Sequence, residues 1–493
     1  MKKVFKRDRL IDINTILSLS IITLFIITVV LYLTYGFPKL IDGFSLFLYA
    51  LLSLQLLMFL RFEKKSRNQL LLLYSFVLVY FYFTRFITIY LNGVSKTTGV
   101  LNRIIPTESY HIQIILFYIF CANFFLFLGL FLPKTLFEKK EQQSLLEPKD
   151  NMVIFLLITI SFCFSIINRF LTYSTFILIE EFFKALVDRT LLISLIILIL
   201  VVFYKYKSFF VKKKICISWN IIWKLFVILY VILRLLEGSR SGLFSLVIIS
   251  FISMLTLNVF KIPQQWIMIF GLTIIVSIIA FPVATKIRNI HYSANNNINY
   301  LGEYYNVLNE GIDYSDISQL APITDRLAYL DMSVDIIKNQ DKYEGVINLE
   351  HYFKSFIDNI TPGFDVYDAP RVAHSLVHYY ANWPLVRIHD YGYQSDMLTI
   401  FGEFYVLFTP VVSMLLFFFV AFAFQVFYNI CYSNKLLNNL FVKFFILLNF
   451  YYLLNSYGLD WYFIELPRNL FSFILIYYII NTFVIFRKEV GKK

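Results

Sequence analysis

Apolar stretches alternate with short polar connections along most of this chain. A transmembrane helix needs about 20 mainly apolar residues to cross roughly 30 Å of hydrocarbon. Stretches that approach or exceed this length occupy residues 13–35, 41–60, 69–91, 111–133, 152–176, 190–204, 219–236, 242–259, 266–284, 397–430, 439–456 and 469–486. The pattern therefore predicts an all-α polytopic membrane protein with about 12 transmembrane helices.

One polar segment, residues 285–396, interrupts this pattern between the ninth and tenth spans. It contains 15 Asp and Glu residues, 8 Lys and Arg residues and five of the six histidines. Within it, apolar residues recur at helical spacing at Leu327, Leu330, Val334 and Ile337. We expect a large, mostly helical loop that separates residues 1–284, with nine spans, from residues 397–493, with three.

Clusters of basic residues recur at alternate connections between the predicted spans. They lie at residues 1–9, 61–67, 134–149, 205–214 and 487–493. Because cytoplasmic loops of membrane proteins are rich in Lys and Arg, we predict that both termini are cytoplasmic and that the 285–396 loop is exterior. The first apolar stretch is too long for a signal peptide and has no cleavage site, so we interpret it as an uncleaved anchor.

Composition and charge narrow the class further. Hydrophobic residues make up 59% of the chain and charged residues only 15%, which is typical of a membrane protein. The net charge of +12 is explained by the basic cytoplasmic loops, so it gives no reason to expect nucleic-acid binding. The predicted exterior loop has no cysteine, which fits a bacterial envelope protein better than a secreted eukaryotic ectodomain. We expect the chain in the bacterial cytoplasmic (inner) membrane, which it crosses many times.

A motif rich in small residues, Leu236–Leu243, joins the seventh and eighth predicted spans. Its residues Ser239 and Arg240 are expected where a helix begins. Free backbone N–H groups at a helix start, together with a guanidinium, would suit a phosphate oxygen. The alternative is an ordinary tight turn in which Arg240 pairs with Glu237.

Two further motifs follow in the polar loop. Asp325–Gly345 places Arg326 at the start of an amphipathic helix that closes at a glycine, and Gly392–Tyr405 leads into the tenth span. Taken in this order, the three motifs resemble those of the superfamily of bacterial O-antigen polymerases (Wzy-type) and O-antigen ligases. The resemblance covers residues 220–430, while the first half of the chain matches in topology alone.

The chain departs from the ligase pattern at one place. Ligases carry a histidine just before the span that follows the loop, whereas this chain has Gln394, Ser395 and Asp396. The departure favours the polymerase branch. The resemblance then implies a glycosyltransferase that moves a growing glycan from undecaprenyl pyrophosphate to a lipid-linked repeat unit, in O-antigen or capsule synthesis. It also implies membrane lipid and a chain-length regulator protein as partners.

The chemistry of such a transfer defines the candidate side chains. Arginine forks can stabilise a departing diphosphate without a metal or another cofactor. Candidates for binding the diphosphate are Ser239, Arg240, Arg288, Arg326 and Arg371. A carboxylate or an imidazole must take the proton from the acceptor hydroxyl. Candidates for this catalytic base are Glu403, Asp396, His374 and His378, with Asp365 and Asp368 as further carboxylates.

Several of these groups also have a purely structural interpretation. His374 and His378 lie four residues apart, a spacing that suits zinc when other ligands join, but loop histidines are more often surface hydrogen-bonding groups. We therefore predict no metal site. Arginines within spans, such as Arg85 and Arg169, are costly in lipid and must face an acidic neighbour or a wet cavity.

Other functions fit the same topology. A ligase is the alternative enzyme of the same superfamily, and a lipid-oligosaccharide flippase is the non-enzymatic alternative. A flippase, however, has no need of an exterior loop of this length. Transferases of the mannosyltransferase type place an acidic pair in their first exterior loop, which residues 35–42 lack. No Gly-rich phosphate loop or Asp-x-Asp motif indicates a nucleotide-sugar donor.

Overall fold

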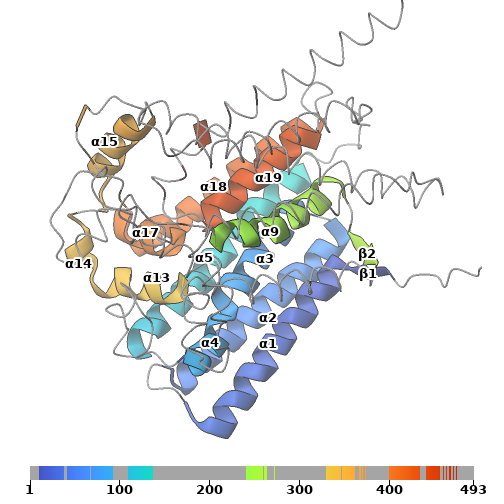
Figure 1. Cartoon of the computed structure of the whole chain (residues 1–493), viewed down its shortest axis with the longest axis vertical. Helices are drawn as coiled ribbons and strands as arrows, with labels where there is room; N and C mark the ends of the chain where they lie inside the picture. Colours follow the sequence, from blue (N-terminus) through green and yellow to red (C-terminus); the bar gives the residue numbers. More distant parts are fainter. Residues whose placement is uncertain are drawn as a thin grey trace, which may run out of the picture.

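The computed structural model describes part of the chain, and nearly all of that part is helical (Figure 1). The described residues are 10–37, 41–66, 68–92, 109–136, 240–258, 260–263, 271, 329–345, 347–360, 366–367, 369, 372, 399–433, 440–455, 459, 462, 466–467, 470 and 474.

The described helices fall into a bundle of long helices and a group of shorter ones from the polar loop. The long helices and their direct continuations are α1 (Ile13–Tyr35), α2 (Gly43–Ser66), α3 (Gln69–Val77), the π-helix η1 (Leu78–Phe83), α4 (Arg85–Asn92), α5 (Ser109–Leu136), α9 (Arg240–Thr256), α17 (Ile400–Leu407), α18 (Pro410–Ser433) and α19 (Leu440–Asn455). The loop helices are α13 (Tyr329–Lys338), α14 (Gln340–Tyr343) and α15 (Leu349–Ile360). Two short strands are also described, β1 (Leu10–Asp12) and β2 (Lys261–Pro263).

Five helical stretches among the described residues are long and apolar enough to cross a membrane. They are Ile13–Tyr35, Gly43–Phe62, Gln69–Thr88, Ser109–Pro133 and Pro410–Cys431. The chain is therefore a helical membrane protein. Helices α9 and α19 match two further predicted spans, although their apolar parts are shorter. The remaining predicted spans lie wholly or almost wholly outside the described residues; they are 152–176, 190–204, 219–236, 266–284 and 469–486. The number of twelve spans therefore stays a prediction.

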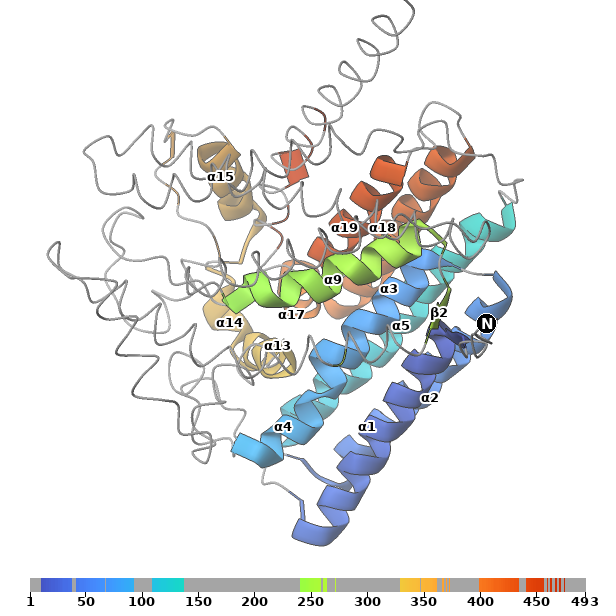
Figure 2. The ribbon, with the colours of Figure 1, turned by 45° about the vertical axis from the view of Figure 1, so that its right-hand side comes forward.

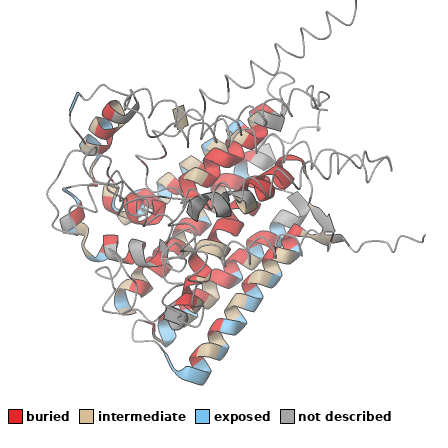
Figure 3. Cartoon of the chain, in the orientation of Figure 1, coloured by how far each residue is buried: buried red, intermediate tan, exposed pale blue. Residues whose placement is uncertain are grey.

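The outer faces of the long helices carry exposed apolar side chains, while the interior of the bundle is buried (Figure 3). Examples of exposed apolar residues are Ile26 and Val30 in α1, Phe47 in α2 and Phe419 in α18. An exposed apolar surface of this extent marks contact with another apolar phase. In a bundle of this length that phase is the lipid, which agrees with the membrane class read from the sequence.

The helix predicted in the polar loop from apolar spacing is confirmed as α13. Three of the four residues that define the spacing, Leu330, Val334 and Ile337, are buried. The regular 3.6-residue repeat therefore identified both the helix and its buried face.

Two predicted spans are not continuous α-helices. The span at residues 69–91 contains the six-residue π-helix η1 between α3 and α4. The span predicted at 397–430 breaks at Phe408, whose backbone is extended (φ −135°, ψ 106°), and a new helix begins at Pro410. Proline offers no N–H to the preceding turn and disfavours helical backbone in the residue before it. The tenth span is therefore shorter than predicted, and α17 precedes it as a separate helix.

The two strands mark one end of the bundle, which we call the strand end. Leu10–Asp12 pairs antiparallel with Lys261–Pro263, and the N–H of Ile13 donates to the carbonyl of Phe260 at 2.9 Å. Helix α1 therefore starts at the strand end, and α9 ends there (Figure 2). It follows that Arg240, the first residue of α9, lies toward the opposite end.

Helices α5 and α18 pack side by side and run in the same direction. The Tyr118 hydroxyl donates to Ser413 Oγ at 2.7 Å, and Asn429 Nδ2 donates to the carbonyl of Pro133 at 3.3 Å. Between these two contacts, Gly129 brings the α5 backbone against the α18 backbone. Small residues at helix crossings permit such close approach in membrane proteins.

Asn68, which caps α3, shows how this pair of helices is oriented. Its Nδ2 donates to the Leu130 carbonyl at 3.2 Å and to Gln425 Oε1 at 2.9 Å. The next residue, Gln69, donates to Asn258, just before β2. The C-terminal halves of α5 and α18 therefore lie at the strand end. Helix α17, which leads into α18, consequently lies at the opposite end, as does the start of α9.

Candidate active site around Glu403

Glu403 lies in the first turn of α17 and is only 1% exposed. The helix begins after Thr399, whose side-chain oxygen accepts a hydrogen bond from the N–H of Gly402 at 3.2 Å and so caps the helix. The free N–H groups and the dipole at a helix start stabilise negative charge. The local sequence thus places a carboxylate where negative charge is favoured.

Both carboxylate oxygens of Glu403 accept hydrogen bonds from segments that are distant in the sequence. The hydroxyl of Tyr352, on α15, donates to Oε1. The backbone N–H of Leu459, beyond the end of α19, donates to Oε2 at 2.8 Å. One side chain therefore joins the polar loop, the start of α17 and the chain that follows α19.

Helix α13 supports the start of α17 from another side. The hydroxyls of Ser333 and Thr399 are hydrogen-bonded to each other, and both residues are buried. Ile336 packs directly on Gly402, because a Cβ atom added at Gly402 would lie 2.9 Å from Ile336 Cδ1. The absence of a side chain at residue 402 therefore permits the close contact between the two helices.

The π-helix η1 also faces this site. The ring of Tyr82 meets that of Phe401 edge to face, with centroids 5.4 Å apart, and its hydroxyl lies next to those of Ser333 and Thr399. A π-helix is a wider turn within an α-helix and is frequently found at functional sites. Here it presents a tyrosine to the junction of α13 and α17.

Arg85, just beyond η1, is 2% exposed although it lies in a predicted span. Its Nη1 donates to Thr88 Oγ1 at 3.2 Å. A guanidinium at membrane depth is costly unless polar groups satisfy its donors, and Thr88 supplies one such group. The Tyr32 hydroxyl of α1 donates to the nearby Phe86 carbonyl at 3.2 Å, which places Arg85 at the end of the bundle opposite the strands.

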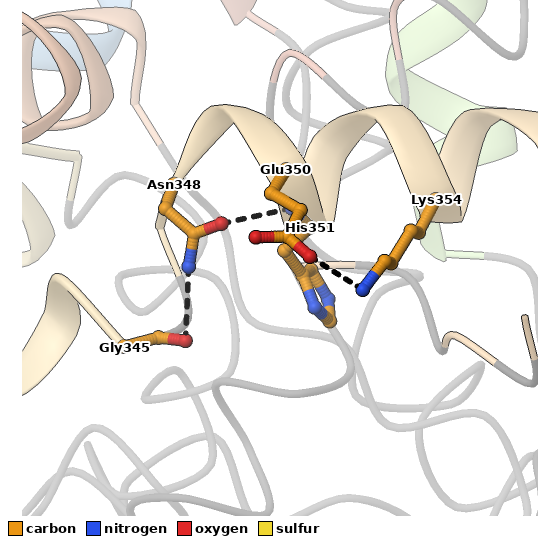
Figure 4. Close-up of polar contacts among 5 residues, drawn as sticks. All are labelled: Gly345, Asn348, Glu350, His351 and Lys354. Carbon is orange, nitrogen blue, oxygen red and sulfur yellow. Dashed lines mark hydrogen bonds and ion pairs between the residues drawn. The ribbon is translucent and has the colours of Figure 1, made fainter.

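Helix α15 has a fixed N-terminus. Asn348 caps it, since its Oδ1 accepts from the N–H of His351 at 2.8 Å and its Nδ2 donates to the Gly345 carbonyl at 3.1 Å (Figure 4). One turn further along, Lys354 Nζ lies 2.6 Å from Glu350 Oε1. The hydrogen bond and charge of Lys354 lower the pKa of Glu350, but the pair is at the surface and adds little stability.

The C-terminal end of α15 is also fixed. Asp358, which is buried, accepts hydrogen bonds from the N–H groups of Val366 at 2.8 Å, Tyr367 at 3.0 Å and Ala369 at 2.7 Å. A buried carboxylate needs such donors, and here the backbone provides them. The chain after α15 is thereby folded back onto the helix, so α15 and the residues around it form one unit that carries Tyr352.

Of the residues predicted for the site, the structure describes the surroundings of Glu403 and the position of Arg240 in the chain. Arg240 is the first residue of α9, as the motif predicted, and it lies at the same end of the bundle as Glu403. The other candidates lie outside the described residues: Ser239, Arg288, Arg326, Asp365, Asp368, Arg371, His374, His378 and Asp396. In the described part of the chain, no group of three or more His, Cys, Asp or Glu side chains could hold a metal.

Sequence reasoning missed three residues that build the site: Ser333, Tyr352 and Leu459. Their contacts join parts of the chain that are more than 50 residues apart, which local patterns do not encode. Leu459 contributes a backbone N–H, so its side chain gives no signal. Tyr352 offers a weak one, because a tyrosine on the buried face of an amphipathic helix carries a hydroxyl that needs a partner.

Comparison of the chain with protein-family models, with curated proteins and with solved structures finds no match.

Proposed function

We propose that this protein is a polymerase of lipid-linked oligosaccharide repeat units in the bacterial cytoplasmic membrane. It transfers the growing glycan from undecaprenyl pyrophosphate to a lipid-linked repeat unit at the exterior face. The observation that carries the proposal is the buried carboxylate of Glu403, held in a membrane protein by hydrogen bonds from two remote segments. A chain-length regulator protein is the further partner that this function implies.

In this proposal Glu403 is the general base. Its carboxylate takes the proton of the acceptor hydroxyl while the hydroxyl oxygen attacks the anomeric carbon of the donor glycan. The bond between that carbon and the diphosphate oxygen breaks, and its electron pair leaves with undecaprenyl pyrophosphate. The proton ends on the carboxylate and the negative charge on the diphosphate, so the step balances without an oxidant or a nucleotide.

The start of α9 supports the proposal because its groups are suited to bind the leaving diphosphate. Free N–H groups at a helix start and an arginine fork are suited to bind a diphosphate. Arg240 occupies this position in the sequence of α9, at the same end of the bundle as Glu403. A base and a diphosphate site at one membrane face are what a reaction between two lipid-linked substrates requires.

The substitution Glu403→Gln tests the role of the base. Glutamine has the same shape and keeps an oxygen that can accept one of the two hydrogen bonds, but it does not take up a proton. Because a general base contributes about 10²–10⁴-fold to the rate, the purified variant should extend lipid-linked repeats at least ~100-fold more slowly. Gel analysis of the labelled products measures this rate. Glu350→Gln, which removes an exposed carboxylate from α15, is the matched control.

A test in cells separates polymerase from flippase. Cells that carry Glu403→Gln should display single repeat units where the parent displays long chains, at an unchanged level of the protein. A flippase defect would instead leave no repeat units at the outer face. Chains of parental length in this variant would remove Glu403 from the mechanism and, with it, the main support for the proposed function.

A further inference from the structure

Glu403 is closed off in the described arrangement. Its side chain is 1% exposed, and Tyr352, which donates to its Oε1, is 7% exposed. A general base must come within hydrogen-bond distance of the hydroxyl that it deprotonates. The hydroxyl that Oε1 accepts from in this structure belongs to the protein itself.

The contact made by Tyr352 is chemically the contact that an acceptor would make. A phenol and a sugar hydroxyl each donate one O–H to a carboxylate oxygen. Leu459 meanwhile holds Oε2 through its N–H at 2.8 Å, which fixes the plane of the carboxylate. A hydroxyl that approaches Oε1 therefore competes with Tyr352 for the same oxygen.

Helix α15 is arranged so that it can move as a unit. It lies away from α1, α2 and α3 in both views (Figures 1 and 2). Its two ends are fixed internally, by Asn348 and by Asp358. On its outer face Leu349 and Phe353 are 61% and 60% exposed. Tyr352 lies on the opposite, buried face, so a shift of α15 as a unit withdraws Tyr352 from Glu403.

We propose that the hydroxyl of Tyr352 occupies the position of the acceptor hydroxyl, so that α15 is a lid which the acceptor displaces. This inference rests on the proposed role of Glu403. The ligand is the hydroxyl-bearing sugar end of a lipid-linked repeat unit. When it binds, Tyr352 leaves Oε1 and the sugar hydroxyl replaces it; no covalent bond to Tyr352 forms or breaks.

The substitution Tyr352→Phe removes the competing hydroxyl and leaves the ring. The KM for the lipid-linked acceptor should fall roughly tenfold, in line with one lost hydrogen bond to a charged group, while kcat stays close to that of the parent. A merely structural role of Tyr352 would lower the amount of active protein and leave the KM unchanged. An increase in KM, or a large loss of kcat, would overturn the lid and make Tyr352 a positioning residue.

A chemical test does not depend on the glycan reaction. A water-soluble carbodiimide with glycinamide labels accessible carboxyl groups, and mass spectrometry of the Glu403 peptide measures the label. We expect little label in the parent and several-fold more in Tyr352→Phe. Tyr32→Phe is the matched control, because it also removes a tyrosine hydrogen bond, to the Phe86 carbonyl at 3.2 Å, but away from Glu403. Equal labelling of the parent and Tyr352→Phe would overturn the proposal.

The unmodified protein provides a third measurement if Tyr352→Phe accumulates poorly. Addition of the lipid-linked acceptor should speed hydrogen exchange in the peptide that covers 349–360, because α15 is displaced. Slower exchange there would show that α15 closes on the acceptor, which contradicts the lid. The outcomes also separate the two proposals. Full activity of Glu403→Gln would refute the role of Glu403 as the base, whereas the labelling and exchange results decide whether α15 is a lid.

Discussion

Replacement of Gly129 by alanine should weaken a close contact within the described bundle, the crossing of α5 and α18. A Cβ atom at residue 129 would lie 2.9 Å from Ala421 Cβ and 3.0 Å from the backbone N of Phe422, and closer still to the carbonyl oxygen of Phe418. Two of these three neighbours are backbone atoms, which cannot rotate away. The helices must therefore move apart.

The size of the movement gives the expected magnitude. Ordinary contact begins at 3.4 Å, so the Ala421 contact alone requires a shift of about 0.5 Å, and the Phe418 contact requires more. An inserted methyl group in a well-packed interior typically costs about 1–3 kcal/mol. The folded-to-unfolded ratio should then fall by a factor of about 5 to 150.

Thermal unfolding of the detergent-purified protein measures the effect as a lower Tm of Gly129→Ala. Gly43→Ala is the matched control, since nothing lies within 4 Å of a Cβ atom at that position. The double variant Gly129→Ala with Ala421→Gly should recover only part of the loss, because the Phe418 carbonyl remains in the way. An unchanged Tm in Gly129→Ala would refute the close crossing of α5 and α18.

Two further predictions concern the opposite end of the bundle. Thr399→Ala removes both the cap of α17 and the hydrogen bond to the buried Ser333, so it should cost about 1–3 kcal/mol of unfolding free energy. The measurement is a lower Tm than in the control Thr34→Ala, whose residue is exposed on α1. Burial alone would raise the pKa of Asp42, but hydrogen bonds from Ser45, Ser109 and Gln113 outweigh it and lower the pKa below 3.8. The ionised Asp42 should thus stabilise the protein above pH 3.8, and this contribution is lost as the pH falls through its folded pKa. Between pH 7 and pH 3, the Tm of Asp42→Asn should therefore fall less than the Tm of the parent.

Much of the described bundle could be predicted because each long helix has a local cause. The apolar stretch at 13–35 has the same bounds as α1, since lipid imposes a length that the sequence shows directly. The start of α9 at Arg240 was predictable from the small residues that precede it. Glu403 was also a natural candidate, because an acidic residue in an apolar stretch is costly in lipid and is often functional.

The features that could not be predicted depend on contacts or on backbone detail. The break at Phe408 was overlooked because apolar content continues across it, although Pro410 was a signal for a new helix. The π-helix η1 does not alter the spacing of apolar residues, so the sequence pattern could not predict it. The hydrogen bonds of Glu403 to Tyr352 and Leu459 appear only once three remote segments meet.

The pairing of β1 with β2 has a consequence for how the protein is made. The ribosome synthesises Leu10–Asp12 about 250 residues before Lys261–Pro263, which at roughly 5–20 residues per second is about 10–50 s. During this time β1 waits for the strand with which it pairs, while the chain between the two strands is still being made. The two strands can meet only if both stay on the same side of the membrane. Their pairing thus requires that the chain between them crosses the membrane an even number of times.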